Sequence, residues 1–333
     1  MRIRRMMALF ATTMSIVTTA VAVGATHAAA AGQAKVAQGH VHGLIQSTGN
    51  LYWTSLTVDG SEVAASIYRA SKSNIPGNEY LLYREYRSDS FSYDDITYAY
   101  TGTWYGYFVV NYFDLGISQI KRVPLSGGNA VTLVTSPSMI GPRDIDTDGS
   151  FLYWADAGGL RKMPLAGGVI TTLAAGTNIT SIGLDAVHVF YSAGPSVRSV
   201  DKAGGNSTSL VTGSANVTSI QVYRASGGTE VYSSWQDGLL RSDTLPAGGV
   251  HVATIYQAAS TQQAISVPGF AFNGSRLVWV NCYYTETGCY NLYSQQGRTK
   301  QLLAYTSGRM RNLQSDTTAV FWNDEYSLWK YLF

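Results

Sequence analysis

A repeated two-part pattern is the feature that most constrains the fold of this chain. Its clearest copy joins a short aromatic strand, residues 151–156, to a segment that ends in a Gly-Gly pair, residues 159–168. The second part recurs at residues 120–128, 197–205 and 240–249. Glycine adopts a positive φ without steric cost, so the Gly-Gly pairs predict tight two-residue hairpin turns between neighbouring strands.

The aromatic strand recurs more often than the Gly-Gly segment, and we count seven copies. They are residues 51–53, 107–110, 152–154, 189–191, 230–233, 277–279 and 320–322. Repeats of about 40–45 residues made of short strands are typical of four-stranded propeller blades. The pattern therefore predicts an all-β fold, a seven-bladed β-propeller of four-stranded antiparallel blades. A six-bladed ring with a degenerate first unit is the alternative.

The ends of the repeat array indicate how the ring closes. The last unit stops after the strand at residues 328–333, so the final blade has only three strands of its own. A spare segment, residues 33–38, precedes the first unit. An N-terminal strand that completes the last blade would leave no large open sheet edge, and we expect this arrangement.

The N-terminus has the layout of a secretory signal peptide. Arg2, Arg4 and Arg5 precede an apolar run at residues 6–23, and small alanines follow it. This layout predicts a signal peptide at residues 1–30 and a single propeller domain at residues 31–333, so the mature chain is secreted or periplasmic. The alternatives are a retained membrane anchor, which the threonines in the apolar run disfavour, and a twin-arginine signal.

Charge limits the classes of partner. Without residues 1–30 the chain carries 20 basic and 21 acidic side chains. This balance provides no electrostatic basis for binding nucleic acid or an anionic membrane in bulk. No second apolar run is long enough to span a bilayer after signal cleavage, and we expect a monomer.

The repeat resembles a known propeller family. The Leu-Tyr-Trp-x-Asp strand at residues 152–156, with its Gly-Gly segment, resembles the YWTD-type (low-density-lipoprotein-receptor class B) and related NHL-like repeats of secreted bacterial proteins. The resemblance covers most of residues 40–333. It implies inter-blade hydrogen bonds from the motif aspartates, Asp156 and Asp324. It implies an architecture and not a function.

The two cysteines predict one disulfide. Cys282 and Cys289 are the only cysteines and flank one short loop. In an exported chain this spacing favours a Cys282–Cys289 bond, which would stabilise the fold by roughly 2–3 kcal/mol on the chain-entropy model. A redox or metal-binding role is the alternative, but no further ligands lie nearby in the sequence.

Three aspartates match the first half of a calcium loop. Asp144, Asp146 and Asp148 alternate and are followed by Gly149, but Ala155 stands where such a loop needs a bidentate glutamate. We therefore favour a strand that ends in an Asp-Gly hairpin turn, and we expect no cofactor. A Ca²⁺ ion on these residues is the alternative.

Recognised catalytic motifs are missing from the sequence. It contains no nucleophile elbow, no His-Glu-x-x-His zinc motif and no phosphate loop, so an enzyme is the less favoured class. The alternative is a propeller enzyme of the lyase or lactone hydrolase type, with a metal or His/Asp site on the central axis. That site would be assembled from residues such as His42, Asp95 and Asp144.

The favoured function is a binding or scaffold protein for an extracellular carbohydrate or a protein or peptide. Loops that vary between blades on a rigid scaffold are the usual place for recognition, and the Gly-Gly turns vary little. We therefore expect the ligand on the face formed by the loops between strands two and three and between successive blades. Its candidate residues are Tyr112, Arg143, Trp235, Tyr283, Tyr284, Arg309 and Tyr326.

Overall fold

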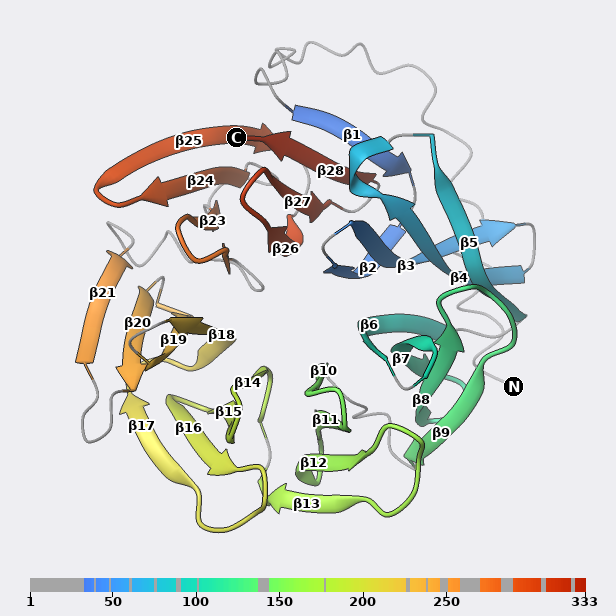
Figure 1. The fold of residues 1–333 in the computed structure, drawn as a ribbon, viewed down its shortest axis with the longest axis horizontal. Helices are drawn as coiled ribbons and strands as arrows, with labels where there is room; N and C mark the ends of the chain where they lie inside the picture. The colour runs from blue at the N-terminus through green and yellow to red at the C-terminus, as the bar shows by residue number, and fades with distance from the viewer. Residues whose placement is uncertain are drawn as a thin grey trace, which may run out of the picture.

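Seven four-stranded antiparallel sheets surround a central axis in the computed structural model (Figure 1). This confirms the predicted seven-bladed β-propeller and excludes the six-bladed alternative. The structure describes residues 33–38, 40–47, 49–59, 62–74, 77–87, 91–100, 102–136, 144–176, 178–225, 228–237, 239–245, 251–257, 270–282, 290–306, 310–324 and 327–333. In these ranges the only helix is the 3₁₀ turn η1 (Lys72–Asn74), and no helix is long and apolar enough to cross a membrane.

Blades 1 to 6 each follow the chain from their innermost to their outermost strand. Blade 1 consists of β2 (His40–Gln46), β3 (Asn50–Asp59), β4 (Glu62–Ser71) and β5 (Glu79–Arg87). Blade 2 consists of β6 (Phe91–Tyr100), β7 (Trp104–Tyr112), β8 (Ile117–Pro124) and β9 (Val131–Ser136). Blade 3 consists of β10 (Ile145–Thr147), β11 (Phe151–Asp156), β12 (Gly159–Pro164) and β13 (Thr171–Ala174). Blade 4 consists of β14 (Ile182–Leu184), β15 (His188–Ala193), β16 (Ser196–Asp201) and β17 (Thr208–Thr212). Blade 5 consists of β18 (Val217–Ala225), β19 (Gly228–Trp235), β20 (Leu239–Leu245) and β21 (His251–Gln257). Blade 6 consists of β22 (Phe270–Phe272), β23 (Leu277–Cys282), β24 (Tyr290–Gln296) and β25 (Thr299–Thr306).

Blade 7 closes the ring with strands from both ends of the chain. It consists of β26 (Arg311–Ser315), β27 (Ala319–Asn323), β28 (Ser327–Leu332) and β1 (Gln33–Gln38). β1 pairs antiparallel with β28, with Gln33 opposite Tyr331, and the two strands lie side by side in Figure 1. The expected N-terminal closure of the last blade is confirmed.

The aromatic strands form the core because their side chains pack between blades. All seven copies are second strands, and Trp154, Trp279 and Trp322 are fully buried there. Trp154 of blade 3 packs in one cluster with Tyr107 of blade 2. Burying a large apolar side chain stabilises a fold by roughly 1.5–3 kcal/mol, so most of this energy is realised only when adjacent blades are both present.

The Gly-Gly pairs have the expected backbone conformation but not the expected turn. Gly127 and Gly128 have φ of 91° and 133°, which side chains with a Cβ rarely adopt. The β-turn lies just before them, because the amide of Gly127 donates to the carbonyl of Pro124 at 2.9 Å. The prediction of two-residue hairpins was therefore wrong: six residues separate the ends of β8 and β9, and the glycines redirect the chain after the turn.

The closure of blade 7 can be tested at Val36 of β1. Val36 is 1% exposed and packs with Leu44 and Trp53 of blade 1 and with Phe321 and Leu328 of blade 7. We expect Val36→Asp to lower the free energy of unfolding by about 3 kcal/mol or more, because it buries an unpaired carboxylate. Thermal unfolding followed by circular dichroism measures the effect.

The neighbouring exposed position provides the control. Lys35 is exposed on the same strand, so Lys35→Ala should change stability by less than about 0.5 kcal/mol. Equal melting temperatures for Val36→Asp and the unchanged chain would contradict closure of the ring by β1.

Candidate functional site

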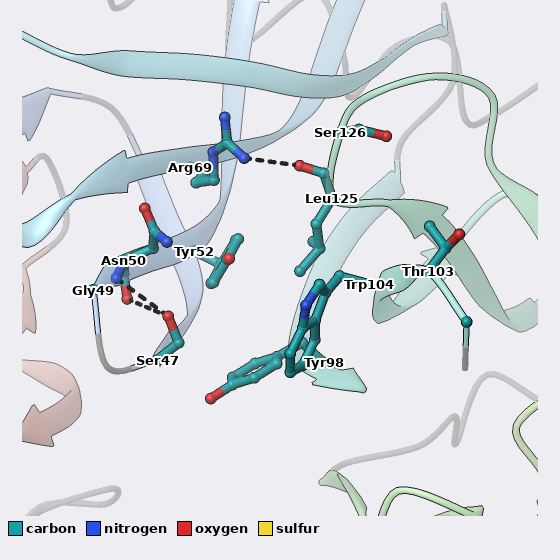
Figure 2. A pocket seen from close by; sticks show the side chains of 11 residues that line it. Ser47, Gly49, Asn50, Tyr52, Arg69, Tyr98, Thr103, Trp104, Leu125 and Ser126 are labelled. Carbon is teal, nitrogen blue, oxygen red and sulfur yellow. Dashed lines mark hydrogen bonds between the residues drawn. The ribbon is translucent and has the colours of Figure 1, made fainter. Parts of the chain in front are cut away.

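A hollow in the described part of the molecule lies between blades 1 and 2. Its volume is about 670 Å³, within the range of small-molecule sites. It opens where the β2–β3 and β6–β7 connections meet the β8–β9 turn (Figure 2). We call this hollow the inter-blade groove; its lining residues are Ser47, Gly49, Asn50, Tyr52, Arg69, Tyr98, Gly102, Thr103, Trp104, Leu125 and Ser126.

Three aromatic rings line one side of the inter-blade groove. The rings of Tyr52 and Tyr98 lie 5.7 Å apart between centroids, and those of Tyr98 and Trp104 lie 5.9 Å apart. Trp104 is 51% exposed, whereas Tyr52 is only 6% exposed. Burial raises the pKa of both the Tyr52 and the Tyr98 hydroxyl above the usual value, so both stay neutral. The groove thus offers apolar ring surface with neutral hydroxyl groups.

Arg69 of β4 supplies the positive charge of the groove. Its Nη1 donates to the carbonyl of Leu125 in the next blade at 3.1 Å, and its guanidinium lies 5.2 Å from the ring centroid of Tyr80. These contacts hold Arg69 in one orientation at the groove wall (Figure 2). Ser47 and Asn50 add hydroxyl and amide groups, and the Ser47 hydroxyl accepts the Asn50 amide at 3.2 Å.

The position of Arg69 belongs to a repeated contact between blades. In blade 2 Arg122 donates to the carbonyl of Leu165 at 3.4 Å, and in blade 3 Lys162 donates to the carbonyl of Lys202 at 2.5 Å. Each cation lies on a third strand and reaches the turn that follows the third strand of the next blade. The sequence reasoning missed these contacts, although basic residues recur just before the Gly-Gly turns.

The expected binding face lies on the other side of the ring and is only partly described. Tyr112 and Trp235 end second strands on that side, but they are 3% and 0% exposed. Tyr112 donates to Glu85 of blade 1 at 3.1 Å, across the interface between blades 1 and 2, and Trp235 donates to the Ser233 hydroxyl of its own blade at 3.0 Å. Both side chains therefore stabilise the scaffold. The other candidates and one cysteine lie outside the described residues: Arg143, Tyr283, Tyr284, Arg309, Tyr326 and Cys289.

Two of the expected axial residues meet near the centre of the ring. Burial, together with the charge of Asp144, raises the pKa of Asp95 well above the usual value, and burial raises that of Asp144 to about 6. Asp95 accepts the amide of Ile145 at 2.8 Å, and Asp144 accepts the amide of Ile182 at 2.8 Å. Within the described residues no three His, Cys, Asp or Glu side chains could together hold a metal ion.

These carboxylates belong to a circle of contacts between innermost strands. Asp144 also accepts the Ser181 hydroxyl at 2.9 Å, and Ser181 accepts the amide of Ile220 at 3.0 Å. Asp95, Asp144 and Ser181 each precede a buried isoleucine on a first strand. Hydrogen bonds at the other four interfaces complete the circle. Gln221 accepts the Phe272 amide and Asn273 donates to the Asp316 carbonyl. Gln46 donates to the Ser315 carbonyl and Tyr98 donates to the Gln46 carbonyl.

Among the described residues Asp156 makes no inter-blade bond of the kind that the family resemblance implied, and the Asp324 contact described here also lies within its own blade. Asp156 accepts the indole N–H of Trp154 at 3.0 Å and pairs with Arg161 at 2.8 Å, all within blade 3. Asp324 likewise accepts the indole N–H of Trp329 at 2.7 Å within blade 7. Contacts between blades come from the first strands, from Arg69, Arg122 and Lys162, and from ion pairs such as Lys121 with Glu85.

Asp146 and Asp148 have different roles from the calcium ligands considered above. Asp148 forms the hairpin turn, since its Oδ1 accepts the amides of Ser150 and Phe151 at 3.0 and 2.9 Å. Asp146 lines a cavity of about 270 Å³ on the axis, together with side chains such as Gln46 and Gln314. Asp144 bonds to blade 4, Asp146 lines the axial cavity and Asp148 lies in the turn, so the three do not converge on one ion.

We expect the charge of Asp146 to make stability depend on pH. Burial raises its pKa to about 7, while the Thr147 amide and Lys202 lower it and Asp144 and Asp148 raise it. Because the folded pKa lies above the unfolded value of 3.8, this group reduces stability as pH rises from about 4 through 7. Asp146→Asn keeps an acceptor for the Thr147 amide and should raise the free energy of unfolding at pH 8 by about 1–2 kcal/mol, with little effect at pH 4.

Asp148→Asn should show the opposite sign. The pKa of Asp148 is lowered to about 2, with bonds from the Phe151 and Ser150 amides, Tyr153 and Lys202 acting against its burial. Its contribution is present above pH 3.8 and is lost as pH falls towards 2. Asp148→Asn should therefore destabilise the fold at pH 7. Urea unfolding of both variants at several pH values measures these effects, and pH-independent differences would contradict the assignment.

Comparisons with solved structures show likeness of fold. YCF48 from Cyanidioschyzon merolae has a TM-score of 0.62 and 11% identity, with coverage of 90% of this chain and 99% of that chain. The β-propeller domain of the Trilobed protease from Pyrococcus furiosus, described as having an open velcro topology, has a TM-score of 0.58 and 9% identity, with coverage of 89% and 96%.

A third similar structure is a puromycin-hydrolyzing peptidase from Mycobacterium tuberculosis, with a TM-score of 0.60 and 15% identity. The match covers 89% of this chain and 50% of the peptidase, so this chain spans about half of the peptidase's length. No protein-family model and no curated protein matches the sequence. The chain is therefore similar to these proteins as a β-propeller.

Proposed function

We propose that this propeller is a binding protein that holds a carbohydrate in the inter-blade groove. The observation that carries the proposal is the exposed indole of Trp104 beside Tyr98 and Tyr52, at the mouth of a hollow of about 670 Å³. Sugar rings present apolar C–H faces that pack on aromatic rings and hydroxyl groups that need polar partners. Ser47, Asn50 and Arg69 supply such partners around the same hollow.

The repeat and the exported location belong to the same proposal. The aromatic second strands and the Gly-Gly connections support a YWTD- or NHL-like repeat, and the basic and apolar N-terminal sequence supports export. An exported protein encounters extracellular glycans and peptides. A carbohydrate fits the groove better than a peptide does, because the hollow offers ring faces and side-chain polar groups instead of an open strand edge.

A propeller enzyme with an axial acid pair receives less support from the geometry. The raised pKa values of Asp95 and Asp144 are of the kind found in general acids. However, both oxygens of Asp95 accept backbone amides, those of Ile96 and Ile145, at 2.9 and 2.8 Å. Serine replaces aspartate at the equivalent place in blade 4, where it makes the same bond to the next blade. These contacts support a structural role for the pair.

The proposal predicts that Trp104→Ala abolishes most of the carbohydrate binding. The full mature chain is applied to a glycan array and a peptide array, and the best neutral oligosaccharide is then titrated by calorimetry. Losing one aromatic contact costs about 1–3 kcal/mol, so affinity should fall roughly tenfold to a hundredfold.

Two variants control for folding and for general aromatic surface. Tyr98→Phe removes the bond to the Gln46 carbonyl but keeps the ring, so affinity should change less than threefold or so. Tyr86→Ala removes a ring that is 52% exposed on β5, outside the groove, and should leave affinity unchanged. Binding of peptides alone, or carbohydrate binding unaffected by Trp104→Ala, would contradict the proposal.

A further inference from the structure

Arg69 is a fixed cation without an acidic partner in the described structure. Some partly buried cations among the described residues form ion pairs, such as Lys72 with Asp316 and Lys121 with Glu85, whereas Arg122 bonds to a carbonyl as Arg69 does. No carboxylate among the described residues lies within 4.0 Å of the Arg69 guanidinium. Among the described residues it contacts the Leu125 carbonyl and the ring of Tyr80.

The remaining hydrogen-bond donors of Arg69 are suited to a carboxylate. A guanidinium has five N–H donors in a rigid plane, and the Leu125 carbonyl takes one of them. Two donors on one side of that plane match the two oxygens of a carboxylate, and such charge-assisted pairs are stronger than neutral hydrogen bonds. Because Leu125 and Tyr80 already hold the side chain, little rotamer entropy is lost when an anion binds.

Arg69 lines the same inter-blade groove as the aromatic rings. Arg69 and Trp104 both line the inter-blade groove, and Tyr52 separates Arg69 from Tyr98 and Trp104 in Figure 2. The positive charge of Arg69 also lowers the pKa of Tyr52, against the larger effect of burial, so the guanidinium lies close to that phenol. A ligand that packs on Trp104 can therefore extend a negative group towards Arg69.

We propose that the inter-blade groove selects carbohydrates that carry a carboxylate, with Arg69 binding that group and Trp104 packing on the sugar ring. The inference rests on the proposed function and adds the substrate class, a uronic-acid sugar. A pyranose with a carboxyl group on its ring is apolar on one face and anionic at one edge. The groove has the matching arrangement of aromatic face and cation.

The test compares an acidic sugar with its uncharged form. Tetragalacturonic acid and its fully methyl-esterified form are titrated into the full mature chain by calorimetry at pH 7. We expect the acid to bind roughly tenfold to a hundredfold more tightly, since a hydrogen bond to a charged group is worth more than a neutral one. In Arg69→Gln that preference should disappear while the weaker binding of the ester remains.

Arg122→Gln is the matched control. Arg122 donates to the carbonyl of the next blade as Arg69 does, but it does not line the groove. The two variants should lose similar stability in thermal unfolding, and only Arg69→Gln should lose the preference for the acid. Raising the salt concentration should weaken binding of the acid and not of the ester.

The outcomes separate this inference from the proposed function. Equal affinity for acid and ester, with both lost in Trp104→Ala, would overturn the role of Arg69 and leave carbohydrate binding intact. If the folded protein binds neither sugar and gives no hit on the glycan array, both the role of Arg69 and the proposed carbohydrate binding are overturned. A third outcome is that neither sugar binds, but a tetrapeptide with a free C-terminal carboxylate binds and the same peptide with an amidated C-terminus does not. That result would overturn the sugar and show that the ligand of Arg69 is a peptide carboxylate.

Discussion

The seven contacts between innermost strands are the constraint on which the rest of the ring depends. At every interface a side chain on or next to a first strand bonds to the backbone on or next to the first strand of the adjacent blade, for example Asp144 to the Ile182 amide at 2.8 Å. A blade by itself is a twisted four-stranded sheet whose large side chains face its neighbours. The axial contacts fix the rotation between sheets, and the aromatic side chains of the second strands then fill the space between them.

These contacts give the acidic pair near the axis, Asp95 and Asp144, a structural role, although burial disfavours negative charge there. Asp95 and Asp144 have raised pKa values because burial disfavours their charged forms and, at Asp95, because the Asp144 charge adds to that effect. Serine at position 181 makes the equivalent bond without a charge. The carboxylates accept amides as serine does, and their protonation links the ring's stability to pH.

Much of the fold could be predicted because the repeat places the same chemistry at the same structural position. The aromatic triplets such as Leu152-Tyr153-Trp154 all lie on second strands, and residues 33–38 complete blade 7 as expected. Spacing does not show which residue of the copy at 107–110 corresponds to Trp154; it is Phe108, which stands opposite Ile96 as Trp154 does opposite Ile145. The longer β6–β7 hairpin and its bulge shift the register there, which spacing alone does not show.

The candidate site was harder to predict because it combines residues from two blades. Tyr52 and Arg69 come from blade 1, and Tyr98 and Trp104 come from blade 2. Sequence reasoning placed recognition on the more variable loops, but Trp235 there is fully buried and stacks with Arg241 at 4.6 Å. Uniform Gly-Gly turns lack side chains for recognition, but at Leu125 such a turn still contributes a carbonyl that orients Arg69. A uniform turn thus becomes part of a specific site when an adjacent blade supplies the side chains.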